Sequence, residues 1–225
     1  MIRDALRIAA EDVRLELRSK EILLTMGFFG FLSVLTLAFA FRRGDAPLSA
    51  VGSGALWVAI AFSGTLGLGR AFERERENDS MRALLLSPVA RPAIYLGKAA
   101  GIVLFMTLVE LVVVPAVLLF FTLPIDLERL GALVALCALG TIGYALVGTL
   151  LAASLVRSGA RDVLLAVVLY PIIVPVIIAG AMGTNALFEP QIAWPELLTW
   201  LRVLGAFDVV FLIVSLWIFE PLLLD

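Results

Sequence analysis

Long apolar segments alternate with short polar ones along the chain, and this pattern predicts six membrane-spanning helices. Each apolar segment is close to the length of about 20 residues that an α-helix needs to cross a hydrocarbon core of about 30 Å. Charged residues gather in the stretches between these segments, where the chain would return to water. The predicted spans cover residues 22–41, 48–69, 99–122, 130–156, 163–182 and 201–219 of a single transmembrane domain, 22–219.

A charge-rich helix is predicted before the first span, over residues 1–21. Apolar residues recur there every three or four positions, which is the period of a helix with one apolar stripe. We interpret the segment as an amphipathic helix lying in the membrane interface, and the alternative is a solvated helix packed on a partner. The segment is too long and too acidic for the start of a signal peptide. The stripe consists of Ile2, Leu6, Ala9, Val13 and Leu17.

The charged segment 70–98 is the most informative polar stretch. It opens with alternating acidic and basic residues, which stabilise a helix in water and do not enter lipid. Asp79 or Ser80 is a suitable N-cap for a short helix that Pro88 ends. We interpret its apolar side as docking into a groove of a cytosolic partner, and the alternative is an amphipathic linker resting on lipid. The residues predicted to transmit force from this partner are Arg70, Phe72, Glu75, Ser80, Met81, Leu84, Leu85 and Pro88.

A few residues inside the predicted spans are unusual for a lipid environment. Glu110 is either a polar residue that lines a substrate or gating pathway, or a residue that joins two helices through a hydrogen bond. Pro171 and Pro175 lie four apart on one face of the fifth span, and each removes a backbone hydrogen bond. They produce either a bend that shapes a lateral cleft or a fixed kink that neighbouring helices accommodate. Asp208, which follows Arg202 in the last span, is expected near the outer interface and is assigned no role.

Composition excludes several classes of function. Of the 225 residues 62% are hydrophobic and 16% are charged, whereas about a quarter of a soluble domain is charged. Basic residues are mixed with acidic ones, so the chain offers no basic face for a nucleic acid. Histidine is absent, which excludes a Ser-His-Asp triad, a HExxH zinc site and histidine-ligated haem within this chain. Ala99 follows Gly97-Lys98 where a phosphate-binding loop needs Ser or Thr, so ATP chemistry requires another chain.

Lys and Arg are distributed unevenly between the two sets of polar segments, and this bias predicts the orientation. With the N-terminus inside, thirteen of them lie in the inside segments, and Arg202 lies at the outer edge of the last span. Both termini are therefore expected in the cytoplasm, with residues 220–225 as a cytoplasmic tail. The outside loops hold three basic residues, Arg42, Arg43 and Arg129.

Motifs along most of the chain occur in the order found in a known family. They are Gly54-Ala-Leu-Trp57-Val58-Ala59, Arg70-Ala-Phe72 with Glu75, Ser80-Met81 with Leu84 and Pro88, Lys98, and Arg157-Ser-Gly159-Ala-Arg161 leading to Pro171-Ile-Ile-Val-Pro175. This ordered set resembles CcmB, the permease subunit of the cytochrome c maturation ABC transporter, also called haem exporter protein B.

The resemblance implies an all-α membrane protein with the fold of a type V ABC exporter half. Such a fold has an N-terminal elbow helix, six spans, and a cytoplasmic coupling helix between spans two and three. Two copies would pair with two CcmA ATPase subunits, beside CcmC and CcmD, in the lipid of the bacterial inner membrane. ATP hydrolysis would release the haem-loaded chaperone CcmE from CcmC. This chain would itself be non-catalytic and hold no cofactor, with ATP acting through the partner ATPase and haem as indirect cargo.

Two other functions remain open from the sequence. One is an ABC-2 permease that exports a different lipid, glycan or drug. The other is a proton-coupled secondary transporter that uses Glu110. Secondary transporters usually contain internal repeats and broken helices, for which 225 residues leave little room.

Overall fold

The structure is a computed structural model that describes residues 2–41, 47–77, 89–155 and 161–222, and every regular element within them is an α-helix. Six of these helices are long and apolar enough to cross a membrane, which confirms the predicted all-α, six-span membrane fold. The helices are α1 (Ile2–Ser19), α2 (Glu21–Ala40), α3 (Leu48–Glu77), α5 (Arg91–Phe120), α6 (Leu127–Ser154), α7 (Arg161–Leu187) and α8 (Trp194–Leu222).

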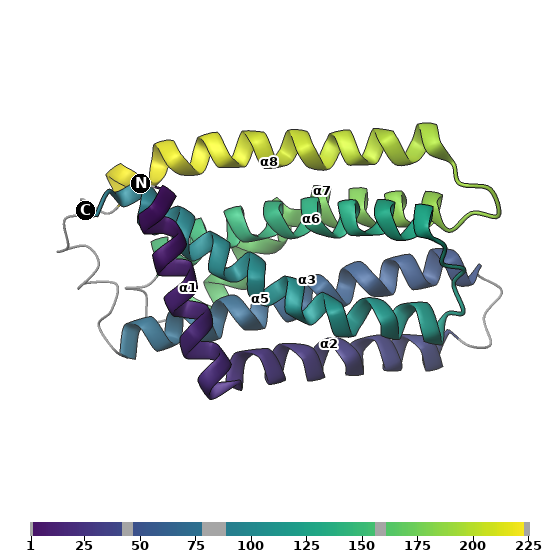
Figure 1. The fold of residues 1–225 in the computed structure, drawn as a ribbon, viewed down its shortest axis with the longest axis horizontal. Coiled ribbons are helices and arrows are strands. Elements are labelled where there is room, and N and C mark those ends of the chain that lie inside the picture. The colour runs from purple at the N-terminus through teal and green to yellow at the C-terminus, as the bar shows by residue number, and fades with distance from the viewer. Residues whose placement is uncertain (1, 42–46, 78–88, 156–160, 223–225) are drawn as a thin grey trace.

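Successive long helices run in opposite directions and form a bundle, and α1 lies across one end of it (Figure 1). Helices α3 and α5 lie at the centre: α3 packs against α2, α5, α6 and α7, and α5 packs against α1, α2, α3, α6 and α8. Helix α8 lies at the periphery against α6 and α7, and much of its apolar surface is exposed. Exposed apolar surface of this extent suits lipid rather than water.

Two predicted boundaries differ from the structure at the charged segment 70–98. Helix α3 continues to Glu77, and helix α5 begins at Arg91 rather than at Ala99. The side chains of Ala93, Ile94 and Tyr95 are fully buried, so this stretch packs inside the bundle. Because charged residues lie on either side of this stretch, the sequence pattern indicated a polar segment there.

The predicted loop 183–200 is also much shorter in the structure. Helix α7 continues to Leu187 and helix α8 already begins at Trp194. A Cβ on Gly183 would lie 2.8 Å from the side chain of Leu136, so the backbone of α7 packs tightly against α6 there. Pro195 is the second residue of α8, in the first turn, where a missing backbone N–H disrupts no helical hydrogen bond.

Small residues allow the central helices to approach closely around one buried tryptophan. Trp57 of α3 is 2% exposed, and its ring contacts Gly140 of α6 and Gly180 of α7, where a Cβ on either glycine would overlap it. Its indole N–H donates to the Thr184 hydroxyl at 2.9 Å. Glycine at such contacts is the usual means of close helix packing in lipid.

The turn between α1 and α2 is fixed by a buried acid. Glu16 is 1% exposed, and its carboxylate accepts hydrogen bonds from the Leu23 backbone N–H at 3.0 Å and the Ser19 hydroxyl at 3.2 Å. It therefore satisfies a donor in the first turn of α2, which has no intrahelical partner. Lys20 makes the change of direction in the left-handed conformation, at φ 59°.

Candidate coupling site and buried polar groups

The end of the bundle that holds α1 also holds the last turns of α3 and the first turns of α5 (Figure 1). Of the predicted coupling residues, Arg70 is exposed on α3 and Phe72 is buried at 1% exposure. Glu75 lies on α3, but its side chain is not among those described. The proposed coupling helix, with Ser80, Met81, Leu84, Leu85 and Pro88, lies outside the described residues.

A buried ion pair joins α1 to α5 at this end. The Lys98 ammonium lies 2.9 Å from both carboxylate oxygens of Asp12, and the Lys98 side chain is only 7% exposed. Lys98 was expected to end the charged segment, but the structure places it inside the bundle. A cation can be buried there because Asp12 compensates its charge.

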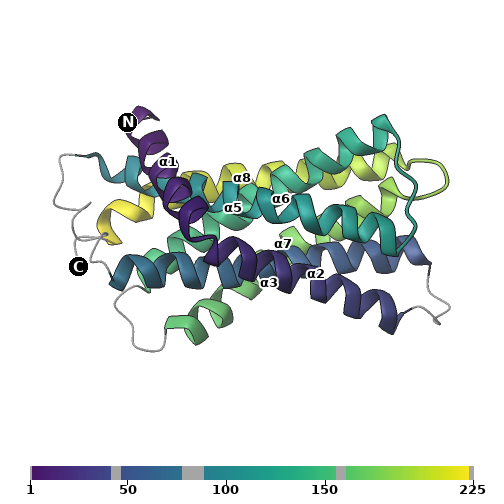
Figure 2. The same ribbon diagram turned by 60° about the horizontal axis from the view of Figure 1, so that its bottom comes forward.

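The first turns of α5, residues 91–101, act as a junction, which we call the base of α5. Gly97 brings this base against α1, since a Cβ there would lie 2.8 Å from the Ala5 carbonyl oxygen. The Tyr95 hydroxyl donates to the Leu146 carbonyl of α6 at 2.8 Å, and the Tyr95 ring lies 5.1 Å from that of Phe219 of α8. The base of α5 thus contacts α1, α6 and α8 together (Figure 2).

Glu110 lies in the bundle interior and is 8% exposed. Its carboxylate accepts a hydrogen bond from the Thr141 hydroxyl of α6. This contact gives physical support to the clamp between helices that was one of the two interpretations. The gating interpretation stays a prediction.

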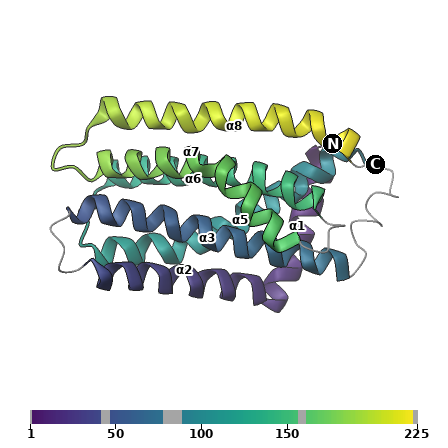
Figure 3. The same ribbon diagram turned by 180° about the vertical axis from the view of Figure 1, so that it is seen from behind.

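Pro171 and Pro175 both lie inside α7, which changes direction along its length (Figure 3). Neither ring is buried, so both face outward from the bundle. Beside them, the Tyr170 hydroxyl lies 3.2 Å from the Thr65 hydroxyl of α3, and the Tyr170 ring lies 5.5 Å from that of Phe62. These contacts attach the middle of α7 to α3.

Asp208 is a buried acid for which the sequence pattern predicts no role. It was expected near the outer interface, but α8 begins at Trp194, so Asp208 lies at the middle of that helix. It is 8% exposed, and neither carboxylate oxygen has a hydrogen-bond partner among the described residues. A charged residue within an apolar span is itself a signal of function. The sequence did not indicate the depth of Asp208, because the loop before it is shorter than the pattern predicts.

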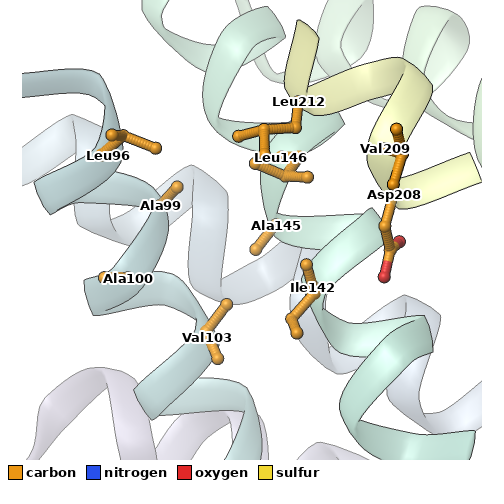
Figure 4. Close-up of a pocket in the computed structure, with 10 residues that line it drawn as sticks. All are labelled: Leu96, Ala99, Ala100, Val103, Ile142, Ala145, Leu146, Asp208, Val209 and Leu212. Carbon is orange, nitrogen blue, oxygen red and sulfur yellow. The ribbon is translucent and has the colours of Figure 1, made fainter. Parts of the chain in front are cut away.

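Asp208 is one of the residues that line a cavity of about 290 Å³ between α5, α6 and α8, although both of its carboxylate oxygens are themselves buried (Figure 4). The carboxylate lies over α6, where a Cβ on Gly143 would be 2.6 Å from one of its oxygens. Every other lining residue is apolar. These are Leu96, Ala99, Ala100, Val103, Ile142, Ala145, Leu146, Val209 and Leu212.

A comparison of the sequence with known proteins finds a family that matches nearly the whole chain. The family model described as CcmB protein matches residues 3–220. A protein named heme exporter protein B from Bradyrhizobium diazoefficiens is 29% identical over 176 residues, which are 78% of this chain and 78% of that protein. Heme exporter protein B from Escherichia coli (strain K12) is 38% identical over 92 residues, 38% of this chain and 40% of that protein.

Proposed function

Because this chain belongs to the CcmB family, we propose that it is the permease subunit of an ABC transporter complex for cytochrome c biogenesis. The names of its relatives describe haem export, and we extend to this chain a part in haem export or handling. In this role the chain is a non-catalytic subunit of a multi-subunit assembly. It lies in the bacterial inner membrane as a multi-pass protein with both termini in the cytoplasm.

The observation that best supports this function is the junction at the base of α5. A force applied to the segment between α3 and α5 reaches a helix that is already joined to α1, α6 and α8. Rigid, well-packed elements are what energetic coupling between distant sites requires. The chain thus has a physical route by which a cytosolic motor could move several spans together.

We propose for this chain the partners that its resemblance to the CcmB family implies. Two copies of this permease pair with two CcmA ATPase subunits, beside CcmC and CcmD, and the cycle releases haem-loaded CcmE. ATP acts through CcmA, this chain binds no cofactor, and haem is an indirect cargo. In this cycle Glu110 clamps α5 to α6, and Pro171 and Pro175 allow α7 to bend.

The docking of the ATPase is tested by one substitution and a matched control. Leu84→Asp places a charge on the apolar side of the coupling segment and should abolish co-purification of the ATPase with the tagged permease. Leu127→Asp makes the same change at an exposed leucine at the opposite end of the bundle and should retain the ATPase. Equal recovery with both variants would contradict the coupling role of the segment.

The cytochrome function has a separate test. A strain that lacks the gene should fail to accumulate c-type cytochromes, measured by haem staining of membrane fractions, and the unsubstituted gene should restore them. Normal accumulation together with a co-purified ATPase would instead favour an ABC-2 permease for another lipid, glycan or drug. Proton-dependent uptake into vesicles with no ATPase would favour a secondary transporter.

A further inference from the structure

The outward surface of α1 is basic, although the helix as a whole has no formal net charge. Its sequence contains four arginines and four acidic residues. The fold removes two of the acids from this surface, because Asp12 is paired with the buried Lys98 and Glu16 is buried beneath the first turn of α2. Asp4 and Glu11 are the acids that remain. Four positive charges against two negative ones leave the outward surface with a net charge of +2.

The four arginines form one row along α1, which we call the arginine row. At about 100° per residue they lie within an arc of about 60°, and the row extends for about 22 Å along the helix. Ala5 and Ala9 are buried on the opposite side of α1, so the row faces away from the bundle. The row consists of Arg3, Arg7, Arg14 and Arg18, all of which are exposed.

Exposed apolar side chains lie beside the arginine row. Ile2 and Leu6 are 72% and 62% exposed, and on an ideal helix they lie about 100° around the axis from the arginines. A helix with this surface lies in the membrane interface, where its apolar side enters the acyl chains and its cations stay among the headgroups. A nucleic acid or an acidic soluble protein would match the arginines but would leave the apolar side chains in water.

The contact between α1 and α5 places α1 at the depth of the headgroups. Helix α5 has 30 residues and is about 45 Å long, which matches a bilayer of about 40–45 Å with its headgroups included. Gly97, which contacts Ala5 and Ile8 of α1, is the seventh residue of α5, about 9 Å from its start. That depth is close to the edge of the hydrocarbon core. Helix α1 also runs across the direction of the long helices, and therefore along the membrane surface (Figure 1).

We propose that the arginine row of α1 binds the phosphate groups of anionic phospholipids in the leaflet at this end of the bundle. A guanidinium group binds two phosphate oxygens at once, and the neighbouring apolar side chains hold the helix at the level of those phosphates. The proposal rests on the membrane-spanning fold and does not depend on the proposed role in cytochrome c biogenesis. It assigns a class of ligand to a helix whose charges cancel in the sequence.

The test measures which lipid lies beside α1 when the full chain is reconstituted in phosphatidylcholine vesicles. A bimane label is attached at Ala10→Cys, an exposed position beside the row, in a Cys137→Ala background. Dibrominated phosphatidylglycerol or dibrominated phosphatidylcholine is then added in increasing proportion, and bromine quenches the label on contact. Phosphatidylglycerol should associate about tenfold more tightly than phosphatidylcholine at about 0.1 M salt, and most of this preference should disappear at about 1 M salt.

Substitutions at exposed arginines make the result specific to the row. Arg7→Gln should reduce the preference for phosphatidylglycerol about threefold, and Arg7→Gln with Arg14→Gln should reduce it to about twofold or less. Arg202→Gln makes the same change at an exposed arginine of α8, at the other end of the bundle, and should leave the preference unchanged. Arg7→Lys with Arg14→Lys keeps both charges and should retain a preference of at least about fivefold.

Four outcomes would overturn the proposal. Equal association of the two lipids, or an equal loss of preference with Arg7→Gln and Arg202→Gln, would show that the row does not select anionic lipid. Absence of quenching by either lipid, with the labelled protein still in the vesicles, would place α1 away from the membrane and favour contact with a soluble partner. Loss of the preference in millimolar inorganic phosphate, at constant ionic strength, would identify a site for the free anion. None of these measurements involves the ATPase or c-type cytochromes, so the proposed function is tested separately.

Discussion

At the scale of single residues, the bundle contains a few buried polar side chains whose partners lie on other helices. Lys98 is buried and paired with Asp12, and Glu110 accepts from Thr141. In each case the two partners come from different helices. A substitution at either partner therefore removes a contact between elements as well as a hydrogen bond.

Lys98→Ala should destabilise the protein by about 3 kcal/mol, because it leaves the Asp12 carboxylate against α5 without its cation. Thermal or denaturant unfolding of the detergent-solubilised protein measures this loss. Arg202→Ala removes an exposed cation from α8 and should change stability by less than about 0.5 kcal/mol. The exchange Asp12→Lys with Lys98→Asp should recover part of the loss, and no recovery would argue against the pair.

Thr141→Val should cost about 1 to 2 kcal/mol, since the Glu110 carboxyl group would lose its hydrogen-bond donor in the bundle interior. Thr141→Ser keeps the hydroxyl and should cost less, by unfolding measured in the same way. Glu110→Gln keeps an acceptor oxygen, so a clamp predicts near-normal accumulation of c-type cytochromes in cells that carry this variant. Loss of that accumulation with unchanged stability would favour the gating interpretation instead.

At the scale of helices, glycine allows neighbouring helices to approach closely at defined contacts. Gly140 and Gly180 lie on two helices that enclose the ring of Trp57 from a third. Other glycines, including Gly131 of α6, have open space where a Cβ would be. The sequence alone does not separate these two kinds of glycine.

Gly140→Ala should therefore destabilise the bundle by about 1 to 3 kcal/mol through overlap with the Trp57 ring. Gly131→Ala, on the same helix, should be neutral or stabilising by up to about 1 kcal/mol, because alanine favours the helix. Unfolding midpoints of the two variants provide the comparison. Equal effects would mean that Trp57 is able to move aside.

At the scale of the whole molecule, α1 and the last residues of α8 lie at one end of the bundle, together with the charged ends of α3 and α5 (Figure 1). The short loop between α7 and α8 lies at the other end. Arg129 is buried there and donates to the carbonyl oxygen of Glu189 at 3.1 Å. Arg129, one of the few basic residues predicted to lie in the outside loops, thus helps to hold this loop in place.

The orientation is testable by cysteine labelling in a Cys137→Ala background. Gln191→Cys, in the exposed α7–α8 loop, should react with a membrane-impermeant maleimide in intact cells whose outer membrane is permeable. Arg14→Cys, on the exposed side of α1, should react only after the inner membrane is opened. The reverse pattern would show that the protein has the opposite orientation. The coupling segment would then lie outside the cytosol, where no ATPase could reach it.

Apolar length made the six spans predictable, because lipid demands long uninterrupted helices. The burial of Lys98 was not predictable, since nothing near it in the sequence indicates that Asp12 returns to meet it from 86 positions earlier. Only part of the predicted stripe of α1 faces the bundle: Ala9 is buried, whereas Ile2 and Leu6 are 72% and 62% exposed. Tertiary contacts decided these features, and helical periodicity alone does not specify them.

The link between α1 and α5 has a mechanical consequence for the lipid. Ile2 and Leu6 point away from the bundle, and amphipathic helices of this kind insert shallowly among headgroups. In the proposed cycle, a shift of α5 would pull α1 sideways through that viscous layer by way of the ion pair. The surrounding leaflet would resist each such movement, so headgroup composition and fluidity would help to set how fast the protein works.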